Sequence, residues 1–151
     1  MKKNILYILL AVFLGCSAAS NIPSDFKVSY ISKSDLTKWS MSIQVEDDVL
    51  KLSYLNNGVV GSGTYSLTHD EVTKLYDYMR ASGFLTIAQP EGEKLTDMPT
   101  QTLSGKYDRK TNTIEFGTVK EPSESLTTLK QMLVDLAGNH NKSFKKVMNF
   151  E

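Results

Sequence analysis

The sequence is poor in the residues that most often build reactive sites. It has one cysteine and two histidines, and its 17 basic residues balance its 17 acidic ones. One cysteine excludes a disulfide within the chain, and His69 and His140 are too far apart in sequence to form a local zinc motif. Balanced charge provides no basic field for phosphates. We therefore expect no metal, no cofactor and no nucleic-acid partner.

The only long apolar run lies at the N-terminus and is too short to span a bilayer. Lys2 and Lys3 precede eleven apolar residues at 5–15, whereas a spanning helix needs about 20. A positive start followed by a short apolar stretch is typical of a secretory signal peptide. The sequence therefore predicts export, with removal of residues 1–15 leaving a net charge of −2 (15 basic against 17 acidic residues).

The apolar run ends at a cysteine. Phe13-Leu14-Gly15-Cys16 resembles the lipobox of bacterial lipoproteins, and this resemblance implies cleavage before Cys16 and acylation of its thiol and new amine. The alternative is ordinary cleavage after Ser17-Ala18-Ala19, which leaves a free protein. We expect lipidation at Cys16, a flexible tether at residues 16–25, and a place in the bacterial cell envelope. Ser17 favours the outer membrane if the cell has two membranes.

The remaining chain alternates strand patterns with two helix patterns. Apolar and polar residues alternate in each expected strand, with turn residues between them. The expected meander strands lie at residues 26–30, 39–45, 50–54 and 59–67, and a second hairpin at 100–107 and 113–119 crosses a five-residue turn at 108–112. These patterns predict an α+β fold: an antiparallel sheet, with a meander of about three to four strands plus a second hairpin, and two helices packed on one face.

Both helices carry local signals at their ends. Thr68 and Glu71 form a capping box, and Gly83 is suited to the left-handed residue after the helix. The second helix is expected to begin at Glu121-Pro122-Ser123 and to end at Gly138. We therefore expect one domain at residues 26–138 and a frayed tail at residues 139–151.

No catalytic motif is present. Gly61-Ser62-Gly63 lacks the lysine of a phosphate-binding loop and indicates a bulge or close backbone contact in a strand. Asp97, Pro99 and Thr100 are candidates for a structural role at the start of a strand, through local hydrogen bonds, or for a partner contact. We expect a protein without enzymatic activity.

Several short motifs occur in an order that resembles a known group of proteins. They are Ser66-Leu67-Thr68, Glu71, Leu75, Gly83-Phe84, Thr96-Asp97-Met98-Pro99-Thr100, a hairpin, Pro122, Leu126, Leu129 and Asp135-Leu136-Ala137-Gly138. This order resembles a family of uncharacterised domains in exported bacterial proteins and, more faintly, emfourin, an inhibitor of thermolysin-type metalloproteases. The first resemblance implies a compact domain of sheet and helices and transfers no active-site residues, and the second implies protease inhibition. From the leader and the absence of catalytic groups, we expect a non-catalytic module that binds an unidentified envelope protein.

Overall fold

The computed structural model describes residues 21–91, 95–117 and 122–144 of the 151-residue chain. The first part is a meander of four strands: β1 (Lys27–Ser34), β2 (Trp39–Glu46), β3 (Val49–Asn56) and β4 (Val59–Ser66). The second part contains α1 (His69–Ala81), the short 3₁₀ helix η1 (Phe84–Thr86), β5 (Thr100–Tyr107), β6 (Lys110–Glu115) and α2 (Glu124–His140).

All six strands belong to one antiparallel sheet in the order β4-β3-β2-β1-β5-β6. The predicted α+β class with an antiparallel sheet is confirmed. The sheet is larger than expected because the second hairpin joins the meander through β1 and β5, where Val28 lies opposite Gly105. The two hairpins are visible in the sequence because their strands are neighbours along the chain, whereas the pairing of β1 with β5 joins distant segments.

The turn between β5 and β6 differs from the expectation. It contains two residues, Asp108 and Arg109, with φ of 51° and 62°, so the predicted five-residue turn is wrong. The carboxylate of Asp25 accepts hydrogen bonds from the backbone N–H of both turn residues, at 3.1 and 2.8 Å. These bonds to a distant aspartate stabilise a turn with two positive φ angles, which the local sequence does not suggest.

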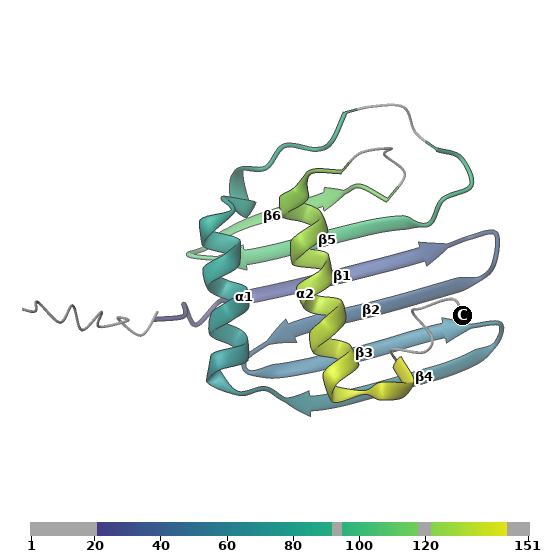
Figure 1. The fold of residues 1–151 in the computed structure, drawn as a ribbon, viewed down its shortest axis with the longest axis horizontal. Coiled ribbons are helices and arrows are strands. Elements are labelled where there is room, and N and C mark those ends of the chain that lie inside the picture. The colour runs from purple at the N-terminus through teal and green to yellow at the C-terminus, as the bar shows by residue number, and fades with distance from the viewer. Residues whose placement is uncertain (1–20, 92–94, 118–121, 145–151) are drawn as a thin grey trace, which may run out of the picture.

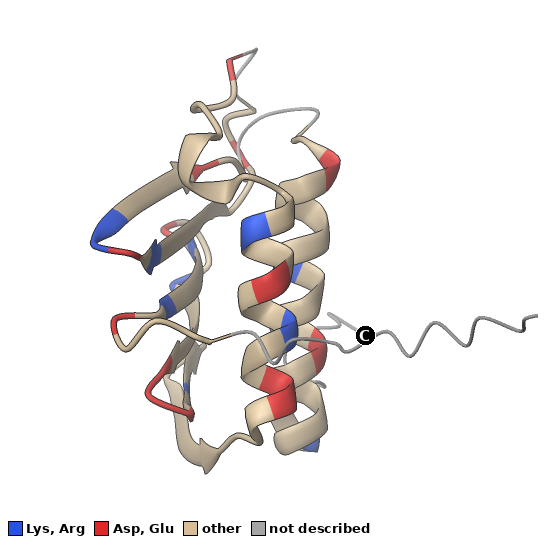
Figure 2. Cartoon of the chain, turned by 90° about the vertical axis from the view of Figure 1, so that its left-hand side faces the viewer, with Lys and Arg blue, Asp and Glu red and all other residues tan. Residues whose placement is uncertain are grey.

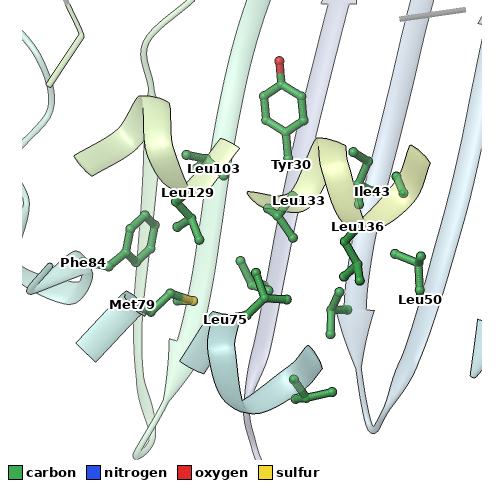
Figure 3. Packing of buried hydrophobic residues seen from close by; sticks show 14 of the residues in the cluster. Tyr30, Ile43, Leu50, Leu75, Met79, Phe84, Leu103, Leu129, Leu133 and Leu136 are labelled. Atoms are coloured by element: carbon green, nitrogen blue, oxygen red, sulfur yellow. The ribbon is translucent and has the colours of Figure 1, made fainter. Parts of the chain in front are cut away.

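The two main helices lie on the same face of the sheet and run across the strands (Figure 1). Seen from the side, the molecule has two layers, with the helices on one side and the sheet on the other (Figure 2). The core fills the space between the layers, where leucines of α1 and α2 meet residues of the central strands (Figure 3). Its most deeply buried side chains include Tyr30, Ile43, Leu50, Met79, Phe84, Leu103, Leu129 and Leu133.

The signals at the ends of α1 are confirmed. The Thr68 hydroxyl accepts the Glu71 N–H at 3.3 Å, and the Glu71 carboxylate accepts the Thr68 N–H at 2.8 Å. Gly83 follows the helix with φ of 64°, a conformation that costs glycine little. This helix start and stop depend on contacts within a few residues, and for this reason the sequence predicts them well.

Helix α2 continues beyond its expected end at Gly138. Gly138 is buried, and the helix runs to His140 before the chain packs Phe144 against Tyr54, with ring centroids 6.0 Å apart. The prediction of a frayed tail is therefore wrong for residues 139–144, while residues 145–151 lie outside the described part. Burial against the sheet outweighs the helix-breaking tendency of glycine, which is about 1 kcal/mol.

Candidate functional site

The chain joins the sheet at one end, which we call the proximal end. It comprises residues 21–25 and the turns at residues 47–48 and 108–109. Ile22 packs partly buried against the core, and the Phe26 N–H donates to the Pro23 carbonyl at 2.9 Å. Residues 22–25, which the sequence assigned to a flexible tether, are therefore held against the domain.

A pocket of about 340 Å³ lies at the proximal end. Asp47, Asp48 and His69 line it together with residues of the incoming chain. His69 is the first residue of α1 and is exposed, as expected for a first-turn position. The described residues contain no group of three or more His, Cys, Asp or Glu side chains placed to hold a metal ion. The pocket is thus formed largely by the segment that leads into the domain.

Exposed apolar side chains gather at the opposite end of the sheet. We call this group the distal rim and define it as Leu36, Val59, Val60, Leu95 and Met98. Leu36 lies in the turn between β1 and β2, and Val59 follows the turn between β3 and β4. These turns and the start of β5 lie at the same end of the antiparallel sheet, to the right in Figure 1.

The exposure of the distal rim is large for apolar side chains. Leu36 is 74% exposed, Val60 76% and Met98 50%. The one other large apolar side chain that is exposed in the described part, Ile31, lies near the middle of β1 and outside this group. Single exposed apolar residues are common on proteins, but a set confined to one end marks a candidate contact surface.

The three candidate residues from the sequence lie beside the distal rim. Asp97 is exposed, Pro99 is partly buried, and Thr100 begins β5 opposite Lys33. No hydrogen bond joins the Asp97 carboxylate to another described residue, so the expected local hydrogen bonds of Asp97 are absent from this part of the chain. Because Asp97, Pro99 and Thr100 lie beside the distal rim, a partner contact stays the prediction to test for them.

The sheet face turned away from α1 and α2 is named here the open face. No described segment covers it (Figure 2). Its side chains are mostly short hydroxyl groups, which leave a flat polar surface: Ser29, Ser40, Ser42, Ser53, Ser62, Thr64, Ser66, Thr100, Thr102, Ser104, Thr111 and Thr113. Ser104 and Thr113 share a hydrogen bond of 3.0 Å across neighbouring strands. Such a surface offers many donors and acceptors, and Ile31 and Val60 are exposed apolar side chains on the same face.

Charges on the open face are concentrated near its proximal end. Glu46 lies 3.2 Å from Lys27 and 3.9 Å from Lys51, and hydrogen bonding to Lys27 is the largest cause that lowers the pKa of Glu46. Lys27 and Lys106 lie opposite each other in β1 and β5 and help line a shallow pocket of about 180 Å³. Because these lysines have acidic neighbours and are substantially exposed, we assign the pocket no ligand.

Two other features singled out in the sequence are Cys16 and the segment Gly61-Ser62-Gly63. Cys16 lies outside the described residues. Gly61 and Gly63 continue the regular pairing of β4 with β3, so the expected bulge is absent. A side chain at Gly61 would collide with the ring of Tyr54, and one at Gly63 with the ring of Tyr65. Close contact with aromatic rings explains these glycines.

A polar cluster between the sheet and α2 was not predicted. The amide oxygen of Gln101 accepts hydrogen bonds from the Tyr30 hydroxyl at 2.9 Å and the Lys130 amine at 3.2 Å. Burial raises the pKa of Tyr30 to about 12, and loss of hydration lowers the pKa of Lys130. The only signal in the sequence is a lysine beside the apolar stripe of α2, which is also common on exposed helices.

His140 also acquires a partner that sequence spacing does not reveal. Its Nε2 lies 2.9 Å from a carboxylate oxygen of Glu71, and its ring lies beside Tyr65, with centroids 5.8 Å apart. Asn141 donates to the Tyr65 hydroxyl at 2.7 Å. These contacts join the end of α2 to the start of α1 and to β4, which indicates a structural role for His140.

Replacing Glu71 by glutamine is expected to reduce the loss of stability in acid. Hydrogen bonding from the Thr68 backbone is the largest cause that holds the pKa of Glu71 below its usual value. A carboxyl group with a lowered folded-state pKa stabilises the protein above its unfolded pKa, and this contribution is lost as pH falls through the folded value. Urea unfolding between pH 7 and about pH 3 should show a smaller loss for Glu71→Gln than for the wild type.

Asp70→Asn provides the matched control for this experiment. Asp70 lies in the same helical turn but is exposed and pairs with Lys74 at 2.7 Å. Glu71→Gln should lose less stability in acid than this variant, because Glu71 caps the helix through the Thr68 backbone. Identical pH curves for the wild type and Glu71→Gln would show that the capping carboxylate does not contribute to acid sensitivity.

Comparison with protein-family models and with curated protein sequences gave no match to this chain. Among the helices that the structure describes, none has the length and apolar character needed to cross a bilayer. The leader sequence and the surfaces of the folded domain are therefore the features that bear on function.

Proposed function

We propose that this protein is a lipid-anchored, non-catalytic module of the bacterial cell envelope that binds another envelope protein through its distal rim. The lipobox-like sequence ending at Cys16 supports the anchor. The observation that carries the binding function is the position of the exposed apolar side chains, which lie at the end of the sheet opposite the incoming chain.

The two ends of the sheet give the anchored protein a direction. Cys16 is six residues before Ile22, and six extended residues reach at most about 20 Å. An acylated Cys16 would hold the proximal end close to the lipid, because Ile22 and Asp25 are already fixed to the domain. The distal rim would then point away from the membrane, where a partner protein can reach it.

The chemistry of the distal rim suits a protein partner. Leu36 and Met98 offer apolar contacts, and Asp97 and Thr100 beside them offer hydrogen-bonding groups. Burial of apolar surface contributes about 25 cal/mol per Å² removed from water, while the surrounding polar groups set orientation. The partner surface should therefore present an apolar patch with a polar margin.

Photocrosslinking in cells tests this function. A photoreactive amino acid placed at Leu36 or Met98 of the full chain should give the same crosslinked product, because both positions belong to the distal rim. The control position is Lys74 on α1, which is exposed on the helix side. Crosslinking at Lys74 that equals crosslinking at the rim, or no product from either rim position, would overturn the proposal.

Protease inhibition is the alternative that the emfourin resemblance implies. A titration of a thermolysin-type protease with micromolar protein separates the two functions. Loss of protease activity would favour inhibition, whereas full activity together with a rim-specific crosslink would favour the binding module.

A further inference from the structure

The two edges of the sheet differ in how well they are protected against pairing with another strand. At the β6 edge, the side chain of Gln89 donates to the Thr113 carbonyl at 2.6 Å and accepts the Glu115 N–H at 3.1 Å. The Gln89 amide thus bonds to outward-facing backbone groups, as a neighbouring strand would. Lys110 and Glu115 also place charges at the two ends of β6. Both features hinder further strand addition at this edge.

The β4 edge lacks such protection among the described residues. The Leu67 N–H donates to the Asp48 carbonyl at 2.8 Å, which places residue 67 in a hydrogen-bonded pair with β3. Hydrogen-bonded residues alternate along an antiparallel strand, so the odd-numbered residues of β4 bond to β3. The backbone N–H and C=O groups of Val60, Ser62, Thr64 and Ser66 therefore point outward.

The composition of β4 leaves this edge available for pairing. The strand reads VVGSGTYS and contains no charged residue and no proline. Val59 is 61% exposed and Val60 76% exposed at its start. A long, uncharged edge with exposed apolar residues is the kind that natural proteins usually protect, because it readily pairs with another strand.

We propose that two copies of this chain associate through antiparallel pairing of their β4 strands about a two-fold axis at Gly63. This arrangement places Ser62 opposite Thr64 of the second copy and Val60 opposite its Ser66. Both pairs use outward-facing backbone groups, so each exchanges two hydrogen bonds. The two strands place no like charges opposite each other, and Gly63 meets its own copy at the close, non-hydrogen-bonded position.

A second copy fits this edge better than an open series of copies. Chains that joined β4 to β6 would form a growing fibre, but Gln89 already bonds to two of the outward groups of β6, the Thr113 carbonyl and the Glu115 N–H. Pairing of β4 with β4 uses one edge from each copy and closes as a dimer. The two-fold axis is perpendicular to the sheet, so the two copies lie side by side with their proximal ends at opposite ends of the paired strands. The pairing itself does not require the lipid anchor.

Sedimentation of the chain from Ser17 to Glu151 tests the dimer. In the described part of the chain, the buried core residues lie between Phe26 and Phe144, and all of them are kept in this chain. Because a single strand pair buries less than the interfaces of stable complexes, we expect a dimer that forms at high micromolar concentration. Ser62→Pro removes an outward N–H from each copy without removing a bond to β3 and should weaken the dimer at least about tenfold.

Thr113→Pro is the matched control. Residue 116 bonds to β5, so the N–H of Thr113 points outward from the other edge, and its loss should leave the dimer unchanged. Circular dichroism and thermal unfolding of both variants show whether each remains folded, and Val60→Lys provides a second β4 variant that should also dissociate the dimer. A wild-type chain that stays monomeric to about 1 mM, or a dimer that folded Ser62→Pro and Val60→Lys leave intact, would overturn the proposal.

Discussion

Replacing Phe84 by alanine is expected to lower the free energy of unfolding by about 3–5 kcal/mol. Phe84 is 1% exposed and begins the short helix η1 after α1. Its ring lies over Gly105 of β5 beside Met79, so it fills the space where the second hairpin meets the helix layer (Figure 3). Since domains of this size are stable by about 5–15 kcal/mol, the loss is a large fraction of the total.

Chemical denaturation measures this effect, and Leu85→Ala is the matched control. Leu85 is the next residue in η1 but is only partly buried, so its truncation should cost clearly less. Equal losses for the two variants would show that η1 does not hold the hairpin through Phe84.

The second large effect is expected from Cys16→Ser. Two or more acyl chains hold a protein stably on a membrane because each buried CH₂ contributes about 0.8 kcal/mol. Without the thiol the chain has no lipid acceptor at this position, and we expect nearly all of the protein to move from the membrane fraction to the soluble fraction. Fractionation of cells followed by immunodetection measures the change.

Ser17→Ala is the control for the cysteine variant, since it changes the next residue and leaves the thiol in place. It should remain in the membrane fraction. Membrane association of Cys16→Ser at the level of the wild type would contradict an anchor at this residue and would place the membrane contact elsewhere in the chain.

Local signals predicted the elements of this fold better than their assembly. The capping box of Thr68 and Glu71 and the left-handed Gly83 depend on neighbouring residues, and the structure confirms both. The two-residue turn at Asp108 bonds to the distant carboxylate of Asp25, a contact that local signals do not reveal. Likewise, Gly138 lies inside α2 because tertiary burial outweighs its low helix propensity.

The candidate site was harder to predict from the sequence than the helix ends. Asp97 and Thr100 were singled out for a local pattern around Pro99, but nothing in that pattern places Leu36 and Val60 at the same end of the sheet. That arrangement arises from the strand order, which joins segments far apart in the chain. The unequal protection of the two sheet edges depends on Gln89, a loop residue with no recognisable motif.

Mass spectrometry of the mature N-terminus, on protein isolated from its native cells, decides whether Cys16 is the lipid anchor. We expect a chain that begins at Cys16 and carries the mass of a diacylglyceryl group on the thiol together with an acyl group on the amine. A chain that begins at Ser20 without lipid, or one that retains Met1, would contradict it.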